Sequence, residues 1–131
     1  MSYVAPIGQM SNENENFRTV VYTDAKLQLV LMKLNPNEDI GEETHQHVEQ
    51  VLAITSNSGM SVLDGVERPI KQGDIVIVPA GVKHNIVNGP GEAMKIITTY
   101  VPPNHIDGTI HKTKADAIAD TKDEAFGESV E

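Results

Sequence analysis

The chain has 131 residues, which is enough for one domain and too few for two of ordinary size. Ten basic residues against nineteen acidic ones give a formal charge of −9. This balance argues against binding to nucleic acid or to anionic membrane surfaces, since both require a basic patch. Cysteine is absent, which excludes disulfides, thiolate catalysis and zinc–thiolate sites.

The N-terminal region is polar and lacks the basic-then-apolar pattern of a secretion signal. The longest apolar run, residues 75–82, is far shorter than the roughly 20 residues needed to cross a bilayer. We therefore expect a cytoplasmic protein with a small-molecule ligand and no membrane or nucleic-acid partner. Residues 11–16, SNENEN, are polar throughout and are predicted to form a loop.

Short runs rich in β-branched and aliphatic residues follow one another along most of the chain, separated by turn-forming residues. The predicted strands are 19–23, 27–34, 50–55, 60–63, 66–71, 74–79, 85–87 and 93–101. Asp64-Gly65, between two of these runs, is a hairpin signal. Strands at this close spacing predict an all-β sandwich or barrel.

The predicted strand 27–34 is apolar on both of its faces. Its side chains alternate as Leu27, Leu29 and Leu31 on one face and Val30, Met32 and Leu34 on the other. A strand with one face in water should instead alternate apolar and polar residues. Either loops of the same chain cover the second face, or that face contacts a partner subunit, so a homodimer is possible.

The C-terminal segment has the composition of a helix. Thr113 followed by Asp116 resembles a capping box, and good helix formers come after it. Gly127 is expected to end this helix. Few of its side chains are apolar, so the sequence predicts a short helix on the periphery of the domain.

Two histidines lie close together in THQHVEQV, residues 44–51. On a strand, residues i and i+2 point to the same side about 6.6 Å apart at Cα, so His45 and His47 could direct two imidazoles at one ion. His84 begins a predicted strand after the tight turn at 79–81. Three histidines at strand starts in an all-β chain predict a shared metal site.

Residues 73–88, GDIVIVPAGVKHNIVN, resemble the second sequence motif of the cupin family. Its glycines, proline, histidine and asparagine fall in register as Gly73, Pro79, Gly81, His84 and Asn88. The tail YVPPNHIDGTIHKTKADA, which starts at Tyr100, is similar to that of small bacterial cupins described as mannose-6-phosphate-isomerase-like. The resemblance covers about residues 25–102.

The first cupin motif is matched less closely. Three residues separate Gly41 from His45, where the family motif has five, and Gln50 takes the place of the motif's glutamate. Glu49 is the alternative, because in strand register it shares the face of His45 and His47. The resemblance therefore implies metal ligands at His45, His47, Gln50 and His84, with Glu49 as the alternative to Gln50.

The resemblance implies one cupin domain over residues 1–131, with a core at about 25–102 and a C-terminal tail and helix at 103–131. The implied fold is an RmlC-like jelly-roll barrel, also called a double-stranded β-helix, with the metal inside one open end. Imidazole ligands suit Fe, Mn, Zn, Ni and Cu alike, so one divalent transition metal is expected without a preference among them.

An ion with open coordination positions can polarise a carbonyl group or activate water. The predicted function is therefore a metal-dependent isomerase or dioxygenase acting on a small, sugar-like metabolite. The alternative is a sugar- or metabolite-binding module with a structural or vestigial metal site. Tyr100, His105 and His111 are candidate catalytic groups; the competing interpretation is a packed aromatic for Tyr100 and a solvated connector for the two histidines.

Overall fold

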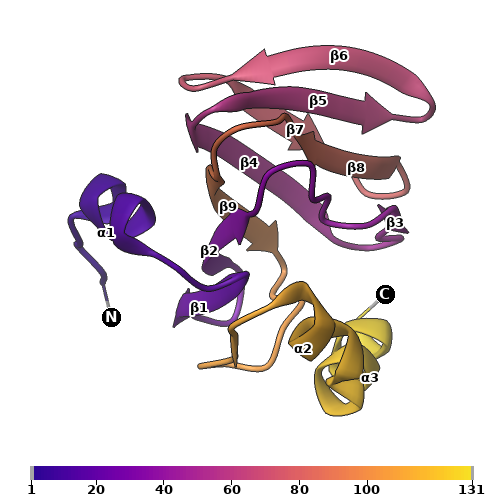
Figure 1. The fold of residues 1–131 in the computed structure, drawn as a ribbon. Coiled ribbons are helices and arrows are strands. Elements are labelled where there is room, and N and C mark those ends of the chain that lie inside the picture. Colours follow the sequence, from indigo (N-terminus) through magenta and orange to yellow (C-terminus); the bar gives the residue numbers. More distant parts are fainter. Residues whose placement is uncertain (1, 131) are drawn as a thin grey trace.

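Two antiparallel β-sheets form the body of the protein in the computed structural model, which describes residues 2–130 (Figure 1). The strands are β1 (Arg18–Thr23), β2 (Gln28–Leu34), β3 (Glu43–Thr44), β4 (Glu49–Ser56), β5 (Ser58–Leu63), β6 (Val66–Lys71), β7 (Ile75–Val78), β8 (Lys83–Asn88), β9 (Met94–Val101) and β10 (Ile110–His111). The helices are α1 (Ile7–Glu13), α2 (Lys114–Ala119) and α3 (Thr121–Ser129).

The larger sheet has six strands in the order β10-β1-β2-β9-β4-β7, and the smaller has four in the order β3-β8-β5-β6. Aliphatic side chains from both sheets fill the space between them, as the alternation of buried and less buried residues along β4, β8 and β9 requires. The predicted all-β jelly roll is confirmed. All eight predicted strands are present, with boundaries within two residues of those expected.

The Asp64-Gly65 turn joins β5 to β6 as the sequence predicts. Leu63 pairs with Val66 across it, and both turn residues have positive φ, 48° for Asp64 and 81° for Gly65. A two-residue turn with this backbone matches the right-handed twist of the flanking strands, and aspartate followed by glycine accepts positive φ readily.

The second apolar face of β2 is covered in part by the chain's own N-terminal region. Residues 7–13 form α1, which contacts β2, β4 and β9, so the loop predicted at 11–16 is wrong over Ser11–Glu13. Ser11 is buried, and its Oγ lies 2.9 Å from Oγ1 of Thr55 on β4. A polar sequence therefore forms a helix here because docking on the sheet stabilises it.

The C-terminal segment forms two short helices instead of the single one expected. The capping box of Thr113 and Asp116 is present at the start of α2, and Asp120 ends α2 while its side chain accepts a hydrogen bond from the Asp123 amide of α3. Helix α3 continues past Gly127 to Ser129, so the expected helix end at Gly127 is wrong. A Cβ at Gly127 would lie 3.1 Å from the Asn104 carbonyl oxygen, which explains why a small residue stands there.

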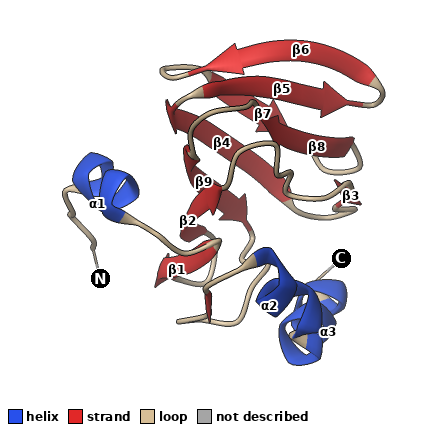
Figure 2. Cartoon of the chain, in the orientation of Figure 1, coloured by secondary structure: helices blue, strands red, loops and turns tan. Residues whose placement is uncertain are grey.

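Figure 2 shows the helices at the two ends of the chain, outside the two sheets. Helices α2 and α3 lie together near the C-terminus, away from α1. Among residues 2–130, no helix is long and apolar enough to cross a membrane.

Candidate metal centre

The smaller sheet brings two of the candidate ligands together by strand pairing. Glu43 on β3 is the register partner of His84 on β8, so their side chains are cross-strand neighbours. His45 follows β3 directly, and its ring centroid lies 5.1 Å from that of His84. Residues separated by about forty positions in sequence therefore meet at one end of the sandwich.

Glu43, His45 and His84 form a group that could hold a metal ion. Their ligand atoms all lie within 4.8 Å of one another, and Oε2 of Glu43 is 3.1 Å from Nε2 of His45. Ligand atoms about 2.0–2.2 Å from one ion lie about 3 Å apart when they subtend a right angle, which matches that spacing. The donor set of two imidazoles and one carboxylate also fits a divalent transition metal.

The surroundings of Glu43 keep its carboxyl group ionised. Burial raises its pKa, but the hydrogen bond to His45 and the nearby positive charge of His45, Arg18 and His84 lower it, with a net shift below the ordinary value. The group thus presents a carboxylate, the form that binds a cation.

His84 is oriented by the backbone of its own turn. Its Nδ1 lies 2.9 Å from the Val82 carbonyl oxygen, so a neutral ring carries its proton on Nδ1 and presents a lone pair at Nε2. Oε1 of Gln50 is 3.1 Å from that Nε2. Gln50 therefore lies directly beside the His84 nitrogen that would bind a metal ion.

Of the remaining predicted ligands, Gln50 lies near the metal-ligand group, whereas Glu49 and His47 are exposed. Gln50 is buried on β4, faces inward, and donates a hydrogen bond to Thr98 Oγ1 at 3.0 Å. Glu49 is exposed on the opposite face of β4. His47 is also exposed and lies outside the group formed by Glu43, His45 and His84.

The position of His47 corrects the assumption that His45 and His47 share a strand. Strand β3 ends at Thr44, and residues 45–48 form a bend before β4 starts at Glu49. The two-residue periodicity of a strand does not apply in a bend, so the two histidines do not point to the same side. Glu43, two residues before His45, is the neighbour brought beside it.

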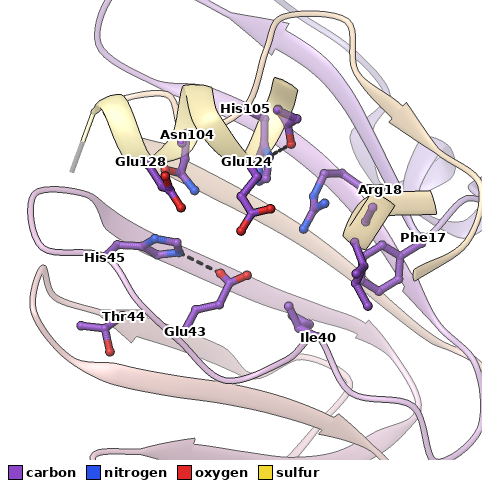
Figure 3. A pocket seen from close by; sticks show the side chains of 14 residues that line it. Phe17, Arg18, Ile40, Glu43, Thr44, His45, Asn104, His105, Glu124 and Glu128 are labelled. Atoms are coloured by element: carbon purple, nitrogen blue, oxygen red, sulfur yellow. Dashed lines mark hydrogen bonds and ion pairs between the residues drawn. The ribbon is translucent and has the colours of Figure 1, made fainter. Parts of the chain in front are cut away.

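A cavity of about 370 Å³ opens beside the metal-ligand group. Glu43 and His45 line one side of it, and β1, the segment before β10, and helices α2 and α3 line the other, as Figure 3 shows. The facing residues with polar side chains are Arg18, Asn104, His105, Asp123, Glu124 and Glu128. The C-terminal helices therefore form one wall of the candidate site.

His105 and Asp123 form a buried pair in this wall. Nδ1 of His105 is 2.7 Å from Oδ2 of Asp123. Burial lowers the pKa of His105 below its ordinary value, with a smaller lowering from Arg18, although the hydrogen bond to Asp123 opposes the shift. Burial raises the pKa of Asp123, but the interactions with His105, the Ile106 amide hydrogen bond and the Arg18 charge together lower it further, so the net shift is downward. The pair is therefore a neutral imidazole held by a carboxylate.

His111 lies behind the cavity wall and supports Arg18. Nη1 of Arg18 donates to Nδ1 of His111 at 3.1 Å, so Nε2 of His111 carries the ring proton and donates to Oδ2 of Asp120 at 2.8 Å. This chain of hydrogen bonds links β1, β10 and the start of α3. It makes His111 a positioning residue for Arg18.

Tyr100 is a buried member of the core, and its ring contacts the rings of two histidines of the site. Its ring centroid lies 6.1 Å from that of His45 and 5.0 Å from that of His105, both in edge-to-face geometry. Burial raises the pKa of Tyr100 far above its ordinary value, so the hydroxyl group stays protonated. The packed-aromatic interpretation describes this placement well.

Six polar residues of the site escaped the sequence analysis: Arg18, Glu43, Asn104, Asp123, Glu124 and Glu128. Arg18 carries a signal that could have found it, because it occupies the same inward face of β1 as Val20, where a charged side chain is unexpected. Glu43 and Asp123 carry none, since acidic residues are frequent around both.

Comparison with known proteins places the chain in a family. The cupin domain family matches residues 30–100, which is more than half of the chain. The YrkC protein of Bacillus subtilis (strain 168) is 37% identical over 123 residues, covering 89% of this chain and 66% of YrkC. The chain thus spans slightly less than two thirds of the length of that relative.

Solved structures agree with this placement. The crystal structure of BH2720 from Bacillus halodurans has a TM-score of 0.89 and 31% identity, covering 91% of this chain and 95% of that one. A predicted oxalate decarboxylase from Thermotoga maritima has a TM-score of 0.62 at 20% identity, covering 66% of this chain and 79% of that one, and it shows likeness of fold alone. By sequence and by fold, the chain belongs to the cupin family.

Proposed function

We propose that the chain is a metal-dependent cupin that acts on a small, polar, sugar-like metabolite. The observation that carries the proposal is the convergence of Glu43, His45 and His84 beside a 370 Å³ cavity whose opposite wall carries His105 held by Asp123. Gln50, next to His84, completes the proposed ligand set in place of His47. A divalent transition metal bound there would polarise a carbonyl or hydroxyl oxygen of the substrate.

Isomerase-type chemistry fits the described residues better than oxygenase-type chemistry. An isomerisation by proton transfer needs a base near a polarised carbonyl group, and the neutral ring of His105 borders the cavity with Asp123 holding its Nδ1. Tyr100 and His111 position His45, His105 and Arg18 through the contacts already described. An oxygenase would need only the ion and an open position for oxygen.

The first test is the metal content of the protein purified without chelators. We expect about one equivalent of a divalent transition metal by elemental analysis. Glu43→Gln and His84→Ala should each lower that occupancy at least tenfold. Loss of a residue that only supports a ligand typically lowers metal affinity about 10- to 100-fold, and loss of a ligand itself should lower it at least as much. His47→Ala is the matched control and should bind the metal as the unchanged chain does.

Turnover then separates the alternatives. Oxygen uptake in the presence of sugar-like substrates identifies an oxygenase, and product formation without oxygen identifies an isomerase. A ligand that raises the melting temperature and yields no product identifies a non-catalytic binding module. The proposal is contradicted if the unchanged chain carries no metal and the His84→Ala variant behaves as the unchanged chain does.

A further inference from the structure

Three buried polar atoms in the wall facing the metal-ligand group lack a hydrogen-bond partner among residues 2–130. They are Nε of Arg18, Oδ1 of Asn104 and Nε2 of His105. Their residues are only 6%, 6% and 7% exposed, and all three line the cavity that Glu43 and His45 also line (Figure 3). We call these three residues the polar wall.

Polar atoms of this kind are scarce in folded proteins, because burying a donor or acceptor without a partner costs free energy. Each such atom has to be explained by function or by a bound molecule. Three of them at one cavity, opposite a group that could hold a metal, indicate that a ligand supplies the missing hydrogen bonds.

The chemistry of the polar wall specifies what that ligand offers. Nδ1 of His105 donates to Asp123, so its Nε2 accepts a hydrogen bond. Oδ1 of Asn104 also accepts, whereas Nε of Arg18 donates. Hydroxyl groups meet all three needs, since each hydroxyl donates one hydrogen bond and accepts others; this remains true if the Asn104 amide is turned over.

The charge around the cavity limits the ligand further. Glu43, Asp123, Glu124 and Glu128 contribute four carboxylates to the lining, and Arg18 contributes one guanidinium group. Even a divalent cation held by Glu43, His45 and His84 leaves this lining negative. Like charges brought together across a binding site disfavour an anionic ligand and so set specificity.

We propose that the polar wall binds a neutral, polyhydroxylated molecule, a free sugar or polyol without phosphate or carboxylate groups. This inference rests on the proposed function, because it names the substrate class of the same site. Two neighbouring hydroxyl groups of the ligand donate hydrogen bonds to His105 and Asn104, and Arg18 donates one to a ligand oxygen. The carboxylates of Glu124 and Glu128, which also line the cavity, repel the phosphorylated counterparts of the ligand.

Matched pairs of ligands test the proposal on the full metal-loaded chain by ligand-observed NMR titration. The pairs are D-fructose with D-fructose 6-phosphate, D-ribose with D-ribose 5-phosphate, and glycerol with glycerol 3-phosphate. We expect at least one neutral member to bind at least tenfold more tightly than its phosphorylated partner. Equal or reversed affinities in every pair, or no binding by any neutral member, overturn the proposal.

Asn104→Leu separates a ligand-binding role from a structural one. The change removes an unpaired buried oxygen and keeps the branched shape of a side chain that borders an open cavity, so the melting temperature without ligand should stay equal or rise, while affinity for the neutral ligand falls about tenfold. Asn12→Leu, on the exposed side of α1, is the matched control and should leave affinity unchanged. Unchanged affinity in Asn104→Leu overturns the proposal.

The double change Glu124→Gln and Glu128→Gln tests the electrostatic part. It should reduce the ratio of affinities between the neutral and the phosphorylated member of a pair severalfold. An unchanged ratio contradicts the electrostatic part of the proposal. Elemental analysis of each variant keeps the two proposals distinct. Asn104→Leu that retains its metal but binds sugar normally refutes the polar wall alone, whereas absence of metal from the unchanged chain refutes the metal centre.

Discussion

At the scale of single residues, His105 has a titration behaviour that stability measurements can detect. Burial and Arg18 hold its pKa below the ordinary value of about 6.5, with Asp123 and Glu43 opposing the shift. The unfolded chain therefore binds a proton at His105 at a pH where the folded chain does not. Protonation of the unfolded chain stabilises it, so acidification below about pH 6.5 favours unfolding.

We expect the free energy of unfolding to be nearly constant above about pH 7 and to fall as the pH drops below about 6.5. Asp123 and Glu43 act at lower pH in the same direction, because their lowered pKa values stabilise the fold above about pH 4 and that contribution is lost as the pH falls through their folded values. The measurement is the melting temperature of chelator-treated protein between pH 8 and pH 5.

His105→Gln isolates the contribution of this ring. The variant should lose less stability than the unchanged chain between pH 7 and pH 5, because it has no group that titrates there at this position. His47→Gln removes an exposed ring instead and should keep the full fall. A melting temperature that rises on acidification, or a His105→Gln variant with the full slope, would show that His105 is not the group responsible.

At the scale of elements, the strands that the sequence predicted are those long enough to show a pattern. Strands β2, β4 and β9 each run for seven or eight residues, and alternation over that length is readable. Strands β3 and β10 have two residues each and show no period, so no pattern could reveal them. Helix α1 was missed because its stability comes from packing on the sheet.

The candidate site was predictable to the same extent as its elements. His84 begins a readable strand, and Gln50 lies in one, so both were placed near the site from sequence. His45 and Glu43 depend on the two-residue β3 and the bend after it, which is why the sequence analysis paired His45 with His47 and missed Glu43. Asp123 meets the site only through tertiary contacts that local sequence does not encode, whereas Arg18 left a signal that was not used, a charged residue on the inward face of β1.

The close pairing of β5 with β8 gives a prediction at this scale. A Cβ built on Gly59 would lie 2.1 Å from the Val87 carbonyl oxygen, so Gly59→Ala must push the two strands apart. We expect the change to lower the free energy of unfolding by about 2 kcal/mol or more, as overpacking does elsewhere. Chemical denaturation with urea measures it.

Gly8→Ala is the control for that prediction. Gly8 lies in α1, and an added Cβ would meet no atom within 4 Å beyond its chain neighbours and the backbone of its own helix. Alanine favours a helix over glycine by up to about 1 kcal/mol, so this variant should be as stable as the unchanged chain or more so. A Gly59→Ala variant as stable as Gly8→Ala would mean that β5 and β8 are not so closely apposed.

At the scale of the whole molecule, the outer face of the six-stranded sheet carries two apolar rows. Strand pairing aligns Leu29, Thr99, Val51 and Ile77 in one row and Leu31, Ile97, Ala53 and Ile75 in the other. The rows end at β7, an edge strand, where Ile75 and Ile77 are 61% and 53% exposed. Leu31 at the β2 end is buried, so the accessible apolar surface lies toward β7, and we expect it to be an interaction site.

A second copy of the chain is the occupant that we expect on this face, since a twofold axis brings the same patch of both copies together. Light scattering should then give twice the chain mass of 14.2 kDa. Ile77→Lys places a charge in the interface and should yield the single-chain mass. Val66→Lys, on the smaller sheet and similarly exposed, should stay dimeric. If the unchanged protein has the single-chain mass at every concentration, the prediction of a dimer through this face is wrong.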